Sequence, residues 1–146
     1  MSKSNSAENS LLLLLFNATT WADLAENDTT SPATSLHVSL HTADPGETGT
    51  QSTSAAAYTN YARVAVARTS GGWTVSGTAP TQAANVAAVT FPQSGSGPET
   101  ETHFGVSTLL SGAGVLLYSG ALTASLVVNS GITPQFAISA LVCTED

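Results

Sequence analysis

The stretch LHVSLHTADPGETG, residues 36–49, indicates a β-strand that runs into a tight turn. With a period of two, Leu36, Val38 and Leu40 point to one side, and the polar residues between them point to the other. Such alternation is typical of a strand with one buried face. In the turn signal at residues 44–46, proline presets φ at one position and glycine accepts a positive φ at the next. The stretch therefore predicts a half-buried strand and its exit turn.

His37 and His41 in this stretch raise the alternative of a metal site. Four residues apart on a helix, two histidines share one face, as in zinc peptidases, which place a glutamate beside the first histidine. Here Val38 occupies that place. On a strand the two side chains lie roughly 13 Å apart, too far to share one ion. We therefore expect no metal ligands and two outward-facing histidines.

Short alternating runs of this kind, separated by turn residues, continue to the C-terminus. Ser70-Gly71 is expected to join the second and third strands as a hairpin, and residues 111–114 the fifth and sixth. Without intervening helices, the pattern favours a mainly β protein, an antiparallel β-sandwich or jelly roll of about eight strands, with a closed barrel as the alternative. The expected strands are residues 36–42, 61–68, 72–76, 86–91, 102–108, 115–119, 122–128 and 134–142.

The first 32 residues predict one α-helix. Residues 5–8, Asn-Ser-Ala-Glu, resemble a capping box, and apolar residues then recur at spacings of three and four as far as Ala25. Leu12, Leu13 and Phe16 fall on the opposite side of that stripe. These three side chains either belong to the core or are covered by another subunit. We expect a helical arm over residues 1–32 and a β-sandwich domain over residues 33–146.

The charge balance limits the partners of the chain. Three basic against ten acidic residues give a formal net charge of -7, which disfavours nucleic-acid binding because phosphate neutralisation needs a basic patch. The apolar run at residues 11–16 is too short for an export signal or a membrane span, so we expect synthesis in a cytoplasm and no membrane partner. The single cysteine, Cys143, is expected to be a small buried hydrophobe.

The sequence offers no active site. Glu99, Glu101 and His103 alternate along one predicted strand after a flexible loop, and we interpret them as a solvated strand edge, where charges discourage unwanted pairing. No serine lies in a Gly-x-Ser-x-Gly elbow, and no glycine-rich phosphate loop is present. We therefore expect a protein that is not an enzyme, with no catalytic residues and no cofactor.

Arg63 and Arg68 are the only cations besides a lysine near the N-terminus. Five apart, they fall on opposite faces of one predicted strand, so at least one points toward a packed layer or a neighbouring chain. An arginine there needs a carboxylate or carbonyl partner. Two alternatives remain: an ion pair within the chain, or a subunit interface that includes Tyr58 and Tyr61, since such interfaces are enriched in arginine and aromatic residues.

Several stretches together resemble a family of small virion proteins encoded by tailed bacteriophages and prophages. The resemblance runs from about residue 8 to the C-terminus and is most specific over residues 41–51 and 58–68. Members are generally labelled tail-fibre or capsid-associated structural proteins, so the resemblance implies a virion component and brings no catalytic residues. The stretches are LHVSLHTADPGETGTQ (36–51), YTNYARVAVARTSGGWTVSG (58–77), THFGV (102–106), GAGVLLYSGAL (112–122) and GITPQF (131–136).

The sequence has none of the repeats that build the shaft of a fibre, and this decides which functional hypothesis comes first. Without heptads, collagen-like triplets or β-helical repeats, we expect first a capsid decoration (cement) protein on the outside of the head. Its expected partners are the major capsid protein and copies of itself in a homotrimer. The alternative is a tail-fibre or baseplate-associated module that contacts the host surface. A carbohydrate-processing enzyme is a third hypothesis, disfavoured because the chain lacks a plausible carboxylate pair.

Overall fold

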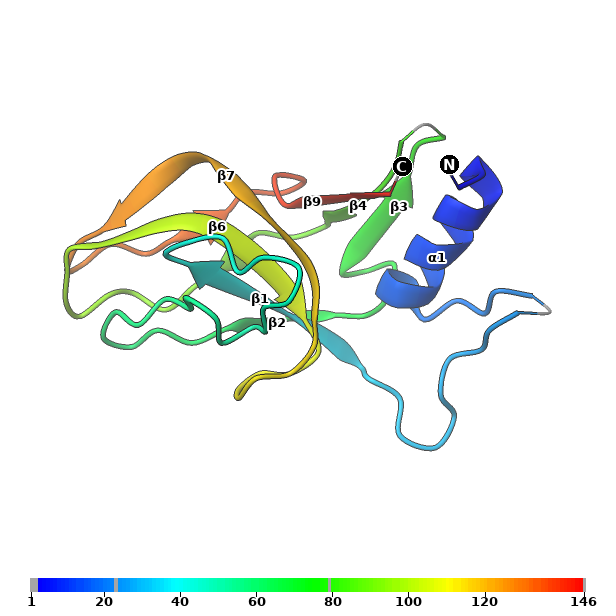
Figure 1. Ribbon diagram of the computed structural model, residues 1–146, viewed down its shortest axis with the longest axis horizontal. Coiled ribbons are helices and arrows are strands. Elements are labelled where there is room, and N and C mark those ends of the chain that lie inside the picture. The colour runs from blue at the N-terminus through cyan, green and yellow to red at the C-terminus, as the bar shows by residue number, and fades with distance from the viewer. Residues whose placement is uncertain (1–2, 23, 79, 146) are drawn as a thin grey trace. The chain divides into compact units, whose positions relative to one another are not determined.

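The computed structural model describes residues 3–22, 24–78 and 80–145, which form one α-helix and nine β-strands (Figure 1). The expected mainly β class with a single N-terminal helix is confirmed, and the pairs β1–β6, β6–β7, β3–β4 and β4–β9 run antiparallel. The elements are α1 (Asn5–Asn17), β1 (Ser35–His41), β2 (Val64–Ala67), β3 (Trp73–Ser76), β4 (Thr81–Asn85), β5 (Val89–Thr90), β6 (Glu99–Ser107), β7 (Leu116–Val128), β8 (Gln135–Phe136) and β9 (Val142–Glu145).

The strands form three sheets, and the chain divides into two compact units. The sheet orders are β2-β1-β6-β7, β3-β4-β9 and β5-β8. The first unit combines the residues up to Ser35 with Val66–Ala88 and the residues from Phe136 onward. The second unit combines Leu36–Ala65 with Val89–Gln135. The expected arm and sandwich, divided at residue 32, stay a prediction. The expected hairpin at Ser70-Gly71 is wrong, because β2 and β3 belong to different sheets.

In the first unit, α1 is capped at both ends by local hydrogen bonds. The Ser4 hydroxyl accepts from the Ala7 amide at 3.3 Å, one residue earlier than the expected cap. At the other end Ala18 adopts a left-handed conformation with φ of 55°, and the Thr19 amide donates to the Leu13 carbonyl at 3.1 Å. The helix thus stops at Asn17, well short of the expected end, although the apolar spacing continues.

The core of the first unit lies between α1 and the sheet β3-β4-β9. Leu12, Phe16 and Trp73 are all fully buried, and the Phe16 and Trp73 rings meet edge to face with centroids 4.9 Å apart. The face of α1 that carries Leu12 and Phe16 therefore belongs to the core. Leu13, the third apolar residue predicted on that side of the helix, is partly exposed. Cys143 is buried there as expected, and burial raises the pKa of its thiol to about 12.

Arg68 holds the C-terminal end of α1. Its Nε donates to the Leu15 carbonyl at 2.6 Å and its Nη2 donates to the Leu14 carbonyl. Nη1 donates to the Asn27 side chain at 2.5 Å and to the Ala33 carbonyl at 3.3 Å. The last carbonyls of a helix have no partner inside the helix and carry partial negative charge. The Arg68 guanidinium donates to two of these carbonyls. The last turn of α1 has no basic residue of its own that could do so.

In the second unit, β1 is buried more completely than its alternation predicts. Val38 and Leu40 are buried on one side, and Ser39 and His41 on the other. The expectation of a half-buried strand with an outward-facing His41 is therefore wrong. After β1 the chain turns as expected: Gly46 has φ of 69°, and its amide donates to the Asp44 carboxylate at 2.9 Å.

The strands β6 and β7 form the long hairpin of this unit (Figure 1). Residues 116–128 are one strand, whereas the sequence predicted two with a break near Gly120. A β-carbon at Gly120 would lie 2.9 Å from the Phe104 ring. Glycine is therefore needed there for close approach of an aromatic side chain, and not for a turn.

Candidate functional site

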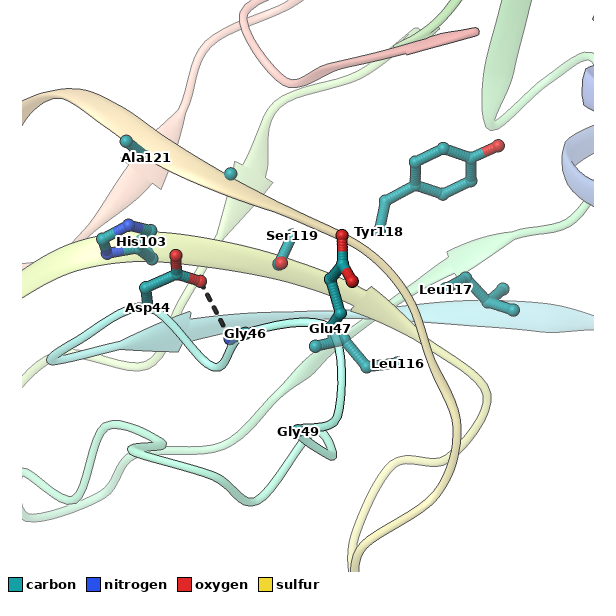
Figure 2. A pocket seen from close by; sticks show the side chains of 11 residues that line it. Asp44, Gly46, Glu47, Gly49, His103, Leu116, Leu117, Tyr118, Ser119 and Ala121 are labelled. Atoms are coloured by element: carbon teal, nitrogen blue, oxygen red, sulfur yellow. Dashed lines mark hydrogen bonds between the residues drawn. The ribbon is translucent and has the colours of Figure 1, made fainter. Parts of the chain in front are cut away.

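A pocket of about 580 Å³ opens on the second unit (Figure 2). The loop after β1 supplies Asp44 and Glu47, β6 supplies His103, and β7 supplies Tyr118 and Ser119 (Figure 2). This volume lies in the range of small-molecule sites. The remaining lining residues are small or aliphatic: Gly46, Gly49, Leu116, Leu117, Gly120 and Ala121.

The pocket wall carries negative charge and hydrogen-bonding groups. Asp44 and Glu47 are exposed, and one oxygen of Asp44 is engaged by the Gly46 amide, which fixes its direction. Neither Arg63 nor Arg68 lines the pocket. A group with several hydroxyls or with a positive charge suits this wall, whereas phosphate or sulfate would be repelled.

Sequence reasoning did not find this pocket. The turn signal at residues 44–46 includes Asp44 but not Glu47, although two carboxylates three residues apart beside a fixed turn are a visible signal. The contributions of His103, Tyr118 and Ser119 depend on the pairing of β6 with β7, which brings Gly105 opposite Ser119 and His103 opposite Ala121.

The interface candidates of the second unit lie largely inside it. Tyr58 is buried, and its ring meets that of Tyr61 with centroids 5.2 Å apart. Tyr61 stacks on Phe91 with centroids 6.3 Å apart, and its hydroxyl accepts from the Leu40 amide at 3.0 Å. Burial raises the pKa of both tyrosines to about 12. These contacts give the two tyrosines a structural role within the unit, and a subunit interface through them stays a prediction.

Arg63 hydrogen-bonds to two loops, one at residues 51–52 and one at Leu109. It donates to the Gln51 carbonyl at 2.8 Å, to the Ser52 hydroxyl at 3.2 Å and to the Leu109 carbonyl at 3.3 Å. The fully buried Gln51 side chain strengthens this junction, since it accepts from the Leu109 amide at 3.1 Å and donates to the Leu109 carbonyl. Within the described chain no carboxylate forms an ion pair with Arg63 or Arg68. The partners are carbonyls, one of the two partner types expected, together with the polar side chains of Ser52 and Asn27.

Glu99 and Glu101 form a carboxyl pair in which Glu101 is fully buried and Glu99 partly buried, which corrects the interpretation as a solvated edge. Strand β6 lies inside its sheet between β1 and β7, and Glu101 has no exposed surface. Glu99 accepts from the amides of Ala57 and Tyr58 at 2.8 and 3.1 Å. Burial, and then the neighbouring carboxyl group of Glu99, raise the pKa of Glu101 to about 8. Glu101 is therefore held largely as a neutral acid near neutral pH.

Both ring nitrogens of His41 are occupied by protein groups. Nε2 lies 2.8 Å from the Ser39 hydroxyl, and Nδ1 lies 2.8 Å from the Thr53 carbonyl. Burial lowers the pKa of this imidazole. In the described segments no group of three or more His, Cys, Asp or Glu side chains is placed to hold a metal ion. His41 thus acts as a hydrogen-bonding bridge inside the unit.

Residues 2–144 match the model of a family named Gp80 and described as podophage GP4 fiber I protein gp80. No curated protein matches the chain. Among the described residues no helix is long and apolar enough to cross a membrane.

Proposed function

Because the chain belongs to the Gp80 family, described as podophage GP4 fiber I protein gp80, we propose that it is a fibre-associated module of a phage virion that contacts the host surface. The family is one of phage structural proteins, and its match covers nearly the whole chain. That match is the observation that carries the proposal. It favours the fibre alternative over the capsid-cement hypothesis, since the family description names a fibre protein.

The pocket of the second unit is the part of this module that suits a ligand. It combines two exposed carboxylates, Asp44 and Glu47, with the aliphatic and aromatic groups of β7. Hydroxyl-rich or amine-bearing groups hydrogen-bond to carboxylates, while ring faces pack on apolar side chains. We assign host-surface contact to this pocket, with a neutral or cationic ligand.

The module works without catalysis in this proposal. A carboxyl pair is present, but Glu101 is fully buried, and Glu99 is held by two backbone amides. General acid–base chemistry requires a group within hydrogen-bond reach of a substrate. The carboxyl pair therefore suits a structural role better than a catalytic one.

The copy number of the protein on the virion tests its location. Quantitative mass spectrometry of purified particles, with the major capsid protein as internal standard, gives this number directly. We expect a handful to tens of copies, and antibody label at the fibres in electron micrographs. Hundreds of copies, with label spread over the head, would instead establish the cement alternative.

A substitution in the pocket tests the ligand contact separately. Glu47→Ala removes one carboxylate from the wall, and Glu26→Ala removes an exposed carboxylate of the first unit as a matched control. A lost hydrogen bond to a charged group corresponds to roughly a tenfold weaker interaction. We expect purified protein with Glu47→Ala to bind host cells about tenfold less tightly and the control to bind normally. Equal binding by both variants would remove the pocket from the proposal while leaving the virion location intact.

A further inference from the structure

The sheet β2-β1-β6-β7 has two very different edges. Strand β2 has four residues and is flanked directly by Arg63 and Arg68. Strand β7 has 13 residues, LLYSGALTASLVV, with no charged residue and no proline. Proteins guard edge strands by shortness, charge and proline, because unpaired backbone groups recruit other strands. The β2 edge is guarded in this way and the β7 edge is not.

The outer side of β7 is open to a partner. In the described residues its neighbour in the sheet is β6 alone. Six of its residues are exposed: Ser119, Ala121, Thr123, Ala124, Ser125 and Val127. A long uncharged edge of this kind is a template for an added strand.

The sequence of β7 is symmetric about Leu122. Three large apolar residues come first, then three small ones, then Leu122, then three small ones and three large apolar ones again: LLY, SGA, L, TAS, LVV. If two copies lie antiparallel across a twofold axis at Leu122, small residues face small ones and apolar residues face apolar ones. The outermost pairs are Leu116 with Val128, Leu117 with Val127, and Tyr118 with Leu126.

We propose that β7 pairs with β7 of a second copy of this chain, antiparallel and centred on Leu122. A twofold contact uses the same surface on both copies, so it requires a self-complementary strand, and this symmetry supplies one. Each copy carries a net charge of -7, so two copies would repel each other if acidic surfaces met. Strand β7 carries no charge, so two copies can meet there without that repulsion. The pairing joins two four-stranded sheets into one of eight strands.

The bulge in β7 begins at the proposed axis and extends to its C-terminal side. Against β6 the register passes from Ala121 to Leu126 across a single residue of β6, so residues 122–125 are the bulged part. On each side of Leu122 a six-residue segment remains. The intermolecular ladder would pair residues 116–121 of one copy with 123–128 of the other, formed twice, and the bulged residues 123–125 supply the inner three pairs of each half.

The test is the mass of the full chain in solution, measured by light scattering and native mass spectrometry over a dilution series. We expect a dimer for the wild type. Thr123→Lys places two like charges diagonally across the axis and should weaken the dimer by up to about fivefold. Ala65→Lys, on the exposed face of the guarded strand β2, is the matched control and should dimerise like wild type.

A charge exchange shows whether the contact is β7 against β7. Thr123→Lys and Thr123→Glu should each dimerise weakly alone, and a mixture of the two should form heterodimers, since opposite charges then meet across the axis. Circular dichroism and melting curves check that both variants remain folded. A monomeric or trimeric wild type, equal dimerisation of wild type and Thr123→Lys, or failure of the mixture to form heterodimers would each overturn the proposal.

Discussion

At the residue scale, the buried Glu101 makes stability depend on pH. Its pKa is raised from 4.5 to about 8 by burial and then by Glu99, and neither of its oxygens has a donor among the described residues. Between these pH values the folded chain binds a proton that the unfolded chain has released. The contribution of Glu101 to the free energy of unfolding is therefore complete below about pH 4.5 and is lost as the pH rises through about 8.

We therefore expect the melting temperature to fall as the pH rises from 5 to 8 and Glu101→Gln, which resembles the protonated acid, to flatten this decline. Differential scanning calorimetry at several pH values measures both curves. Glu47→Gln removes an exposed carboxylate and should leave the slope unchanged. An identical slope for wild type and Glu101→Gln would show that another group titrates in this window.

At the element scale, α1 depends on a residue far from it in sequence. Arg68 donates to the Leu14 and Leu15 carbonyls and to the Asn27 side chain, and a lysine cannot make these contacts together. We expect Arg68→Ala to lower the free energy of unfolding by about 2–4 kcal/mol, because the helix carbonyls lose a charged donor.

Urea denaturation followed by circular dichroism measures the effect, and Arg68→Lys should recover only part of it. Lys3→Ala is the control, since Lys3 forms a partly exposed ion pair with Glu145 at 2.6 Å that should be worth at most about 1 kcal/mol. If the two alanine variants prove equally stable, the arginine does not hold the helix end.

The boundaries of the elements show what sequence patterns could and could not predict. The strand at residues 36–42, the turn at Gly46 and the β6–β7 hairpin follow from alternation and turn residues alone. The end of α1 was missed because Ala18, with no sequence signature of a helix stop, adopts a left-handed conformation. Strand β4, TQAAN, was missed because polar residues and alanine give no strand signal.

The candidate site was predictable only in part, because its residues meet through tertiary pairing. The carbonyl partners of Arg63 and Arg68 were among the expected types, but nothing in the sequence indicates that these partners are the 51–52 loop and the end of α1. The pocket likewise depends on the pairing of β6 with β7. Periodicity reports which face of an element is apolar, and it does not report which distant segment covers that face.

At the scale of the whole molecule, the first unit is assembled from three separate stretches of chain. Its core combines Leu12 and Phe16 of α1 with Trp73 of β3 and Cys143 of β9. Deletion of residues 1–32 would remove one side of this core. We expect the truncated chain to expose Trp73 and Cys143, because the apolar face of the sheet β3-β4-β9 is then uncovered.

Tryptophan fluorescence and the rate at which Cys143 reacts with a thiol reagent measure this exposure. In the full-length protein the thiol should react slowly, since it is buried and its pKa is about 12. A chain without the first 32 residues that keeps slow thiol reactivity and an unchanged melting temperature would instead support the prediction of an independent β domain over residues 33–146.

The three-stretch construction also sets an order of events during synthesis on the ribosome. Both stretches of the second unit, Leu36–Ala65 and Val89–Gln135, have been translated before β9 is made. The first unit cannot close its sheet until β9 joins β4, so α1, translated first, waits longest for its complete packing surface. A chain that ends after Gln135 should therefore show the protease resistance of the second unit and not that of the first, and its Leu12 and Phe16 should be available to chaperones.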